Sequence, residues 1–140
     1  MRLEIEGGGD QEPLPNDGAG LCAFFSFAVS RGFGATHPLI ALADRLHDRH
    51  HVRMGPLTTF YDGEIEDAED RAKLELAWQD AAGLGESLAA LVAAMESDEQ
   101  SQTLARRGGA DELDEEASAL LAQVLTASEA SRRVRMVYAL

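Results

Sequence analysis

The residue types needed for thiol hydrolysis occur in one order along the chain: Cys22, then the histidine pair His50 and His51, then Asp62. Cys22 follows a turn-rich loop and lies in the first turn of a predicted apolar helix, where unpaired backbone N–H groups stabilise a thiolate. A histidine at position 50 or 51 would act as the base, and Asp62 would orient its ring. The sequence therefore admits a small Cys-His-Asp hydrolase or transferase that uses Cys22, His51 and Asp62.

The segment DGAGLCAFF, residues 17–25, resembles the glycine-then-cysteine helix start of papain-like thiol hydrolases. The likeness is confined to this one segment and assigns no family. The alternative interpretation is that Cys22 is a small buried hydrophobic residue, which is what free cysteines most often are. We favour this alternative and keep the thiol enzyme as the second hypothesis.

Another group of side chains has the spacing of a metal site. If residues 38–51 are helical, Asp44, His47 and His51 lie at positions i, i+3 and i+7 on one face. Two imidazoles at His-x3-His spacing are typical of zinc sites on helices, and Asp44 would be the third ligand. The neighbouring Arg45 and Asp48 fit an ordinary polar helix face equally well, and the positive charge of the arginines disfavours a dication. We therefore expect no cofactor, with a divalent metal such as zinc as the alternative.

Acidic and basic residues are segregated along the chain, whose net charge is −13. Residues 61–129 contain 18 acidic and 4 basic side chains, whereas all four histidines lie between positions 37 and 51 among arginines. Direct binding to nucleic acid needs clustered Lys and Arg, so this composition argues against it. The histidines would gain positive charge between about pH 7 and 5, which could strengthen contacts with the acidic segments.

The ends of the chain show the alternation of β-strands. Leu3 and Ile5 alternate with charged residues in the first six positions, and Val134, Met136 and Tyr138 alternate near the C-terminus. Pairing the two segments would bring the arginines at 133 and 135 near the glutamates at 4 and 6, which is a favourable cross-strand arrangement.

The rest of the sequence predicts mainly helices. Residues 20–30 are apolar on nearly every side, which is typical of a helix at the centre of a fold. Further helices are predicted over 38–50, over 64–82, after the breaks at Gly83 and Gly85, and after a cap at Asp111. Residues 51–61 favour a β-hairpin around Gly55-Pro56. The expected fold class is α+β, with four or five helices and a small sheet from the N- and C-terminal strands, which the central hairpin could extend.

These observations favour a single globular domain over residues 1–140 that binds another protein and has no catalytic activity. The expected partner has a basic surface, or is a second copy of the chain; an adaptor, an inhibitor or a subunit of a larger complex would all fit. The expected interface residues are Trp78, Glu66, Asp67 and Asp70, because tryptophan is enriched among interface hot spots. No stretch has the roughly 18 apolar residues needed to span a membrane. The single cysteine and the absence of a signal-peptide pattern favour a cytoplasmic protein.

Overall fold

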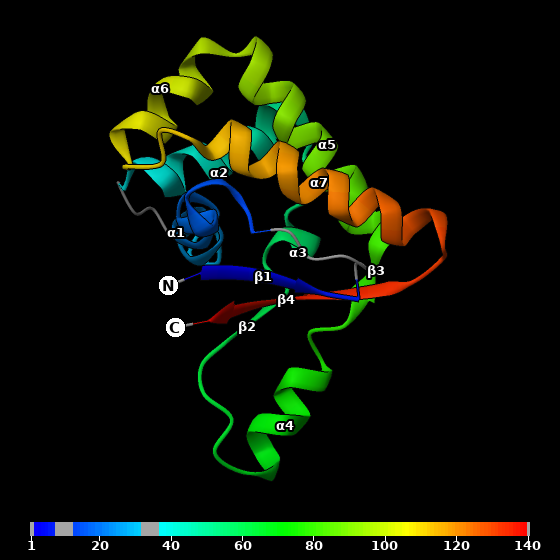
Figure 1. Cartoon of the computed structure of the whole chain (residues 1–140). Coiled ribbons are helices and arrows are strands. Elements are labelled where there is room, and N and C mark those ends of the chain that lie inside the picture. The colour runs from blue at the N-terminus through cyan, green and yellow to red at the C-terminus, as the bar shows by residue number, and fades with distance from the viewer. Residues whose placement is uncertain (1, 8–12, 32–36, 140) are drawn as a thin grey trace.

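The two ends of the chain meet in a small β-sheet. The computed structural model describes residues 2–7, 13–31 and 37–139 (Figure 1). Strand β1 (Arg2–Glu6) pairs antiparallel with β4 (Arg133–Ala139), as the alternation at both ends predicts. On its other side, β4 pairs in parallel with β2 (Phe60–Asp62) and antiparallel with β3 (Gln79–Asp80). The last strand of the chain is therefore the centre of the sheet.

The register of this pairing separates an apolar face from a charged one. Leu3 lies opposite Tyr138 and Ile5 lies opposite Met136, and all four side chains are buried. On the other face, the predicted opposite-charge arrangement forms at one position, where Arg135 faces Glu6 across the strands. Since residues of one strand alternate between faces, a slip by one position would expose the apolar set, so burial fixes the register.

Helices make up most of the remaining chain, and the predicted α+β, mainly helical class is confirmed. Figure 1 shows α4 on one side of the sheet and the other labelled helices together on the opposite side. Seven α-helices and one short 3-10 helix occur in the described residues, more than the four or five predicted: η1 (Pro15–Gly18), α1 (Ala19–Ala28), α2 (Pro38–His50), α3 (Met54–Leu57), α4 (Ala68–Glu75), α5 (Ala81–Ser97), α6 (Glu99–Arg107) and α7 (Leu113–Glu129).

The predicted helix over residues 64–82 is wrong at both ends. Only α4 is helical there, and the chain then enters β3 before α5 begins at Ala81. Gly83 and Gly85, which were expected to end a helix, lie inside α5. A Cβ added at Gly85 would lie 3.6 Å from Cγ1 of Val124, so this glycine lies where α5 packs closely against α7. Tertiary packing outweighs the low helix propensity of glycine at this site.

The predicted hairpin over residues 51–61 is also wrong. Residues 54–57 form the single helical turn α3, which tolerates Pro56 because the first turn of a helix leaves backbone N–H groups unpaired. The residues that follow do form a strand, but its partner is β4, far away in the sequence. The apolar run was recognisable as a strand, whereas its partner was not.

The hydrophobic core lies between the apolar face of the sheet and the helices. The helix α1 is central, as its lack of a polar face predicts: Leu21, Phe24 and Phe25 are fully buried. Buried side chains of α1, α2, α5, α7 and the sheet form one cluster in the part of the chain described. Within the same residues, no helix has the length and apolar character required to cross a membrane.

Candidate functional site

Cys22 lies in the first turn of α1, as predicted, but its surroundings oppose thiolate formation. The side chain is buried, and burial is the main cause that raises the pKa of the thiol to about 11. The negative charges of Glu116 and Asp62 raise the pKa further. A reactive cysteine needs the opposite, a positive and partly exposed environment. The environment of Cys22 is that of a packed hydrophobic residue.

The other two residues of the thiol-enzyme hypothesis lie on different elements. His51 is the left-handed residue that ends α2 (φ 55°), and its side chain is exposed. Asp62 is the exposed last residue of β2, opposite Tyr138. Among the described residues, no hydrogen bond joins Cys22 to His51 or His51 to Asp62. The Tyr138 hydroxyl instead donates to the Cys22 carbonyl (3.0 Å), which ties α1 to β4.

The proposed metal ligands lie on and just beyond α2. Asp44 and His47 are helical, whereas His51 follows the last helical residue and has left-handed backbone angles. His47 Nδ1 lies 2.9 Å from Asp48 Oδ1. Within the described residues, no three or more His, Cys, Asp and Glu side chains are arranged to hold a metal ion. Zinc binding by Asp44, His47 and His51 stays a prediction.

Three of the residues expected at an interface, Glu66, Asp67 and Asp70, belong to a segment that stands away from the body of the protein (Figure 1). We call residues 62–76 the acidic arm: it contains seven acidic and two basic side chains, a net charge of −5. Its helix α4 has no buried residue and projects from the open side of the sheet (Figure 1). A helix this short is marginal in water without packing. Its stability must therefore come from caps and from its attachment at either end.

Two of the expected interface acids cap α4. Asp67 precedes the helix, and its Oδ1 accepts from the Asp70 N–H (2.9 Å). Asp70 Oδ2 accepts in turn from the N–H of Glu66 (2.9 Å). Carboxylates at this end also favour the helix dipole. Asp67 and Asp70 thus serve the local structure of the arm, whereas the side chain of Glu66 is exposed.

Tyr61 lies beside this cap and joins the arm to the sheet. Its hydroxyl donates to the Glu64 carbonyl (3.1 Å). Burial raises the pKa of Tyr61, and the negative charges of Asp70, Asp67 and Glu66 raise it further. The three acids expected from the sequence therefore lie near one half-buried tyrosine and near one another.

Trp78 anchors the other end of the arm. It is half-buried, and the guanidinium carbon of Arg135 lies 4.5 Å from the centre of a Trp78 ring, in cation–π geometry. Arg135 also pairs with Glu6 of β1 (2.5 Å) and reaches Glu75 of α4 (3.5 Å). Its side chain is only 14% exposed. The Arg135 side chain therefore links β1, the end of α4 and Trp78.

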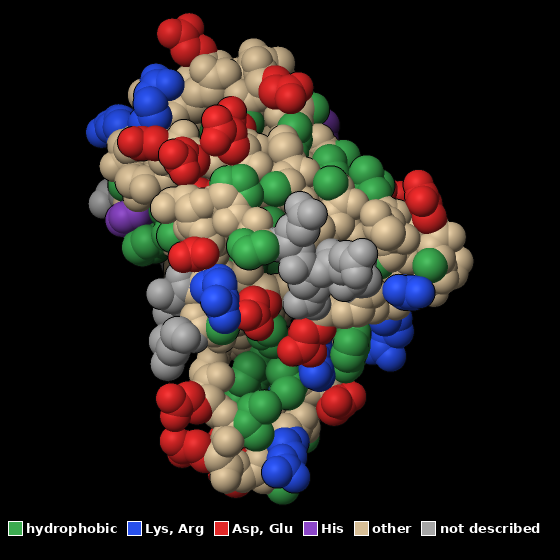
Figure 2. Space-filling view, viewed as in Figure 1, with side chains coloured by type: hydrophobic (Ala, Val, Ile, Leu, Met, Phe, Trp, Pro, Cys, Tyr) green, Lys and Arg blue, Asp and Glu red, His purple; other side chains and the backbone are tan. Residues whose placement is uncertain are grey.

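Two apolar side chains of the acidic arm face solvent. Leu76 is 80% exposed and Ile65 is 48% exposed. Hydrophobic side chains also gather on the surface between the sheet and α4, with acidic side chains at its edges (Figure 2). Neither residue was among those predicted for the interface from the sequence. An apolar surface edged by carboxylates is suited to contact with a protein that is both basic and apolar.

Two further carboxylates are withdrawn from solvent and serve the fold. Glu116 of α7 is fully buried, and its Oε1 accepts from the Leu21 N–H at the start of α1 (3.1 Å). Burial raises its pKa. Its second oxygen has no hydrogen-bond partner in the described residues. The sequence indicates that Glu116 is buried, because position 116 lies on the apolar face of the last helix with Leu113, Ala117 and Leu120.

Asp98 is the other such carboxylate, and it joins α2 to α6. It accepts two hydrogen bonds from Arg45 (2.6 and 3.1 Å) and one from the Ser101 hydroxyl (2.6 Å), and lies 2.9 Å from His50 Nε2. The hydrogen bonds from Arg45 are the first cause that holds the pKa of Asp98 well below its usual range. Arg45 and His50 of α2 thus stabilise the contact with α6. The sequence alone could not show that Asp98 is their partner, because it lies about 50 positions away.

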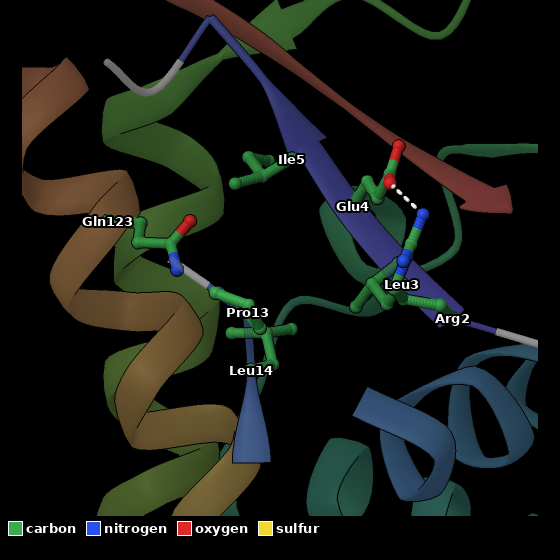
Figure 3. A pocket seen from close by; sticks show the side chains of 7 residues that line it. All are labelled: Arg2, Leu3, Glu4, Ile5, Pro13, Leu14 and Gln123. Atoms are coloured by element: carbon green, nitrogen blue, oxygen red, sulfur yellow. Dashed lines mark ion pairs between the residues drawn. The ribbon is translucent and has the colours of Figure 1, made fainter. Parts of the chain in front are cut away.

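A cavity of about 160 Å³ lies beside β1. Figure 3 shows the side chains around it and the ion pair that joins Arg2 to Glu4 (2.8 Å). It is smaller than the clefts of about 300 Å³ or more in which small molecules usually bind. Its lining residues are Arg2, Leu3, Glu4, Ile5, Pro13, Leu14 and Gln123.

Comparison with known proteins gives no further assignment. The chain matches no model of a protein family, no curated protein sequence and no solved structure. The functional argument therefore depends on the geometry of the chain alone.

Proposed function

We propose that this chain is a non-enzymatic binding protein whose acidic arm contacts a basic protein surface. The observation that carries the proposal is the arm itself: a segment of net charge −5 whose helix buries no residue, yet which exposes Leu76 and Ile65. Leu76 in particular, at 80% exposure, gains little from burial in the isolated chain. Covering Leu76 and Ile65 with a partner would remove apolar surface from water at about 25 cal/mol per Å².

The charge of the arm defines the chemistry of the partner. Like-charged surfaces are excluded by repulsion, and a basic surface is attracted before contact is made. Exposed carboxylates that take no part in capping, such as Glu64, Glu66 and Glu69, would meet Lys or Arg at the rim of the interface. Ile65, Leu76 and the ring of Trp78 would supply its apolar part. An adaptor, an inhibitor or a subunit of a complex would use the arm in the same way.

The thiol-enzyme hypothesis has less support. Burial raises the pKa of Cys22, nearby carboxylates raise it further, and His51 makes no hydrogen bond with Cys22 in the described residues. Each of these observations opposes nucleophilic attack by a thiolate.

The proposal is tested with two synthetic peptides of equal length and equal positive charge. One is an amphipathic Lys/Leu helix and the other contains Lys and Gln. Neither contains tryptophan, so the fluorescence of Trp78, the single tryptophan of the chain, reports binding. We expect the Lys/Leu peptide to bind more tightly, since it offers both charge and apolar surface. Equal affinity for both peptides would reduce the effect to non-specific charge attraction and would overturn the proposal.

Matched variants assign the binding to the arm. We expect the triple variant Glu64→Gln, Glu66→Gln, Glu69→Gln to weaken binding, whereas Glu86→Gln, Glu96→Gln, Glu99→Gln makes the same charge change at exposed positions elsewhere. Likewise, Ile65→Ser should weaken binding more than Leu125→Ser, because the two side chains are similarly exposed (48% and 47%) but only Ile65 belongs to the arm. The sequence also allowed a second copy of the chain as the partner, and sedimentation of the free protein tests this by detecting self-association.

A further inference from the structure

A second surface, away from the arm, has the opposite chemistry. A cleft of about 420 Å³ opens where the start of α5 meets the end of α7. Two arginines, one carboxylate, two serines and the first residues of α5 line it: Arg53, Arg132, Asp80, Ser128, Ser131, Ala81, Ala82 and Gly83. Its volume falls in the range of about 300 to 1,000 Å³ that is typical of small-molecule clefts.

The backbone of each arginine is fixed against α5. The Arg53 carbonyl accepts a hydrogen bond from the Ser87 hydroxyl of α5 (2.7 Å), and Ser87 is buried. The Arg132 carbonyl accepts from the N–H of Ala81, the first residue of α5 (3.3 Å), and the N–H of Arg132 donates to the Ala127 carbonyl (3.0 Å). Backbone positions that the fold holds in place therefore bring both arginines to one cleft.

Neither guanidinium has a protein partner in the residues that the structure describes. This contrasts with Arg45 and Arg135, each of which pairs with a carboxylate. The difference is informative in a chain of net charge −13, where acidic side chains outnumber basic ones about two to one. Asp80 lines the same cleft without forming an ion pair with Arg53 or Arg132 and without a side-chain hydrogen bond to the start of α5. The cleft thus retains two unpaired positive charges against one negative charge.

From these features we infer that the cleft binds the phosphoryl group of a small molecule. Arginine guanidinium groups present donors in a fork that matches phosphate oxygens, and the hydroxyls of Ser128 and Ser131 add two more donors. The first residues of α5 line the cleft, and the positive end of the helix dipole lies there, which adds to the attraction for an anion. The space beside Gly83 is open to a ligand, because a Cβ built at this glycine would meet no atom within 4 Å. This inference is independent of the proposed function, since no cleft residue belongs to the acidic arm.

The test titrates the whole chain with inorganic phosphate and with pyrophosphate, at an ionic strength held constant with chloride, and follows backbone amide resonances. We expect saturable shifts confined to residues 53, 81–84 and 128–132. The variant Arg53→Gln, Arg132→Gln should bind at least tenfold more weakly. The variant Arg106→Gln, Arg107→Gln makes the same charge change at exposed positions of α6 and should bind within twofold of the unmodified chain. Equal losses in both variants, or shifts that do not saturate, would overturn the inference.

A third variant distinguishes loss of phosphate binding from loss of folding. Gly83→Glu adds a carboxylate at the start of α5, where there is space for it and where negative charge favours the helix dipole. The variant should keep the melting temperature and lose phosphate binding. Retained phosphate affinity in this folded variant would place the anion elsewhere and contradict the assignment.

Discussion

The side chain of Arg135 is the most sensitive point of attachment of the acidic arm. Its guanidinium pairs with Glu6 (2.5 Å), reaches Glu75 (3.5 Å) and lies 4.5 Å from the centre of a Trp78 ring. Replacing Arg135 with Gln removes the cation–π contact, worth about 0.5–1 kcal/mol, and a half-buried ion pair worth about 1 kcal/mol. We therefore expect the free energy of unfolding to fall by about 2 kcal/mol, or the melting temperature by roughly 6 °C.

The measurement combines urea denaturation with fluorescence. Because Trp78 is the single tryptophan, its emission reports the arm directly, and loss of the stacked guanidinium should expose the ring and shift its emission to longer wavelength. Arg133→Gln is the matched control, since it removes one positive charge from the neighbouring exposed position of β4. A double-mutant cycle with Glu6→Gln should give a coupling energy of about 1 kcal/mol.

The reasoning would be refuted by an Arg135→Gln variant with unchanged Trp78 emission and a stability within about 0.5 kcal/mol of the unmodified chain. The same stability loss in Arg133→Gln would also refute it, because a general charge effect would then explain the result.

Three further predictions follow from buried or paired side chains. Cys22, whose pKa is raised to about 11, should carry roughly a hundredfold less thiolate than an ordinary thiol of pKa 9.0. Mass-resolved alkylation at pH 7–9 should be slow until urea is added, and fast native labelling would contradict this. Burial raises the pKa of Glu116 above its ordinary value of 4.5, so the folded state binds protons more strongly than the unfolded state. Stability should then fall as pH rises from 4.5 through the raised pKa, and Glu116→Gln should remove that part of the slope in urea titrations at several pH values; equal slopes would argue against it. Asp98→Ala removes the Arg45 ion pair and the cap of α6, and should cost about 2–3 kcal/mol in the same denaturation assay; a loss under about 0.5 kcal/mol would be inconsistent with the contacts.

The sequence by itself determined the features that depend on local periodicity. Leu3 and Ile5 alternate with charges at one end of the chain, and Met136 and Tyr138 alternate at the other, so each strand has one face that must be buried. The absence of a polar face on residues 20–30 placed α1 in the centre for the same reason. The opposite charges of Glu6 and Arg135 could also be predicted to meet, because both residues alternate with the buried apolar residues of their strands.

The limits of the helices were decided by contacts that periodicity does not encode. The low helix propensity of glycine predicts that a helix ends near Gly85. This glycine instead lies inside α5, because a residue without a side chain suits the close packing of α5 against α7. Residues 57–61, rich in threonine and aromatic side chains, were predicted to form half of a hairpin, yet β2 pairs with β4 in parallel. The pairing of two strands more than 70 positions apart cannot be predicted from a short stretch of sequence.

The character of each candidate site was likewise decided by the tertiary structure. Trp78, Glu66, Asp67 and Asp70 were identified as a group, but only the fold shows that two of them cap α4 and that Trp78 stacks on Arg135. Cys22 lies at a helix start, as the sequence predicts, but only the fold shows that burial raises the pKa of its thiol. The physical reason is common to all of these cases. Burial and electrostatic potential are sums over neighbours from the whole chain, whereas periodicity records only which face of one segment is apolar.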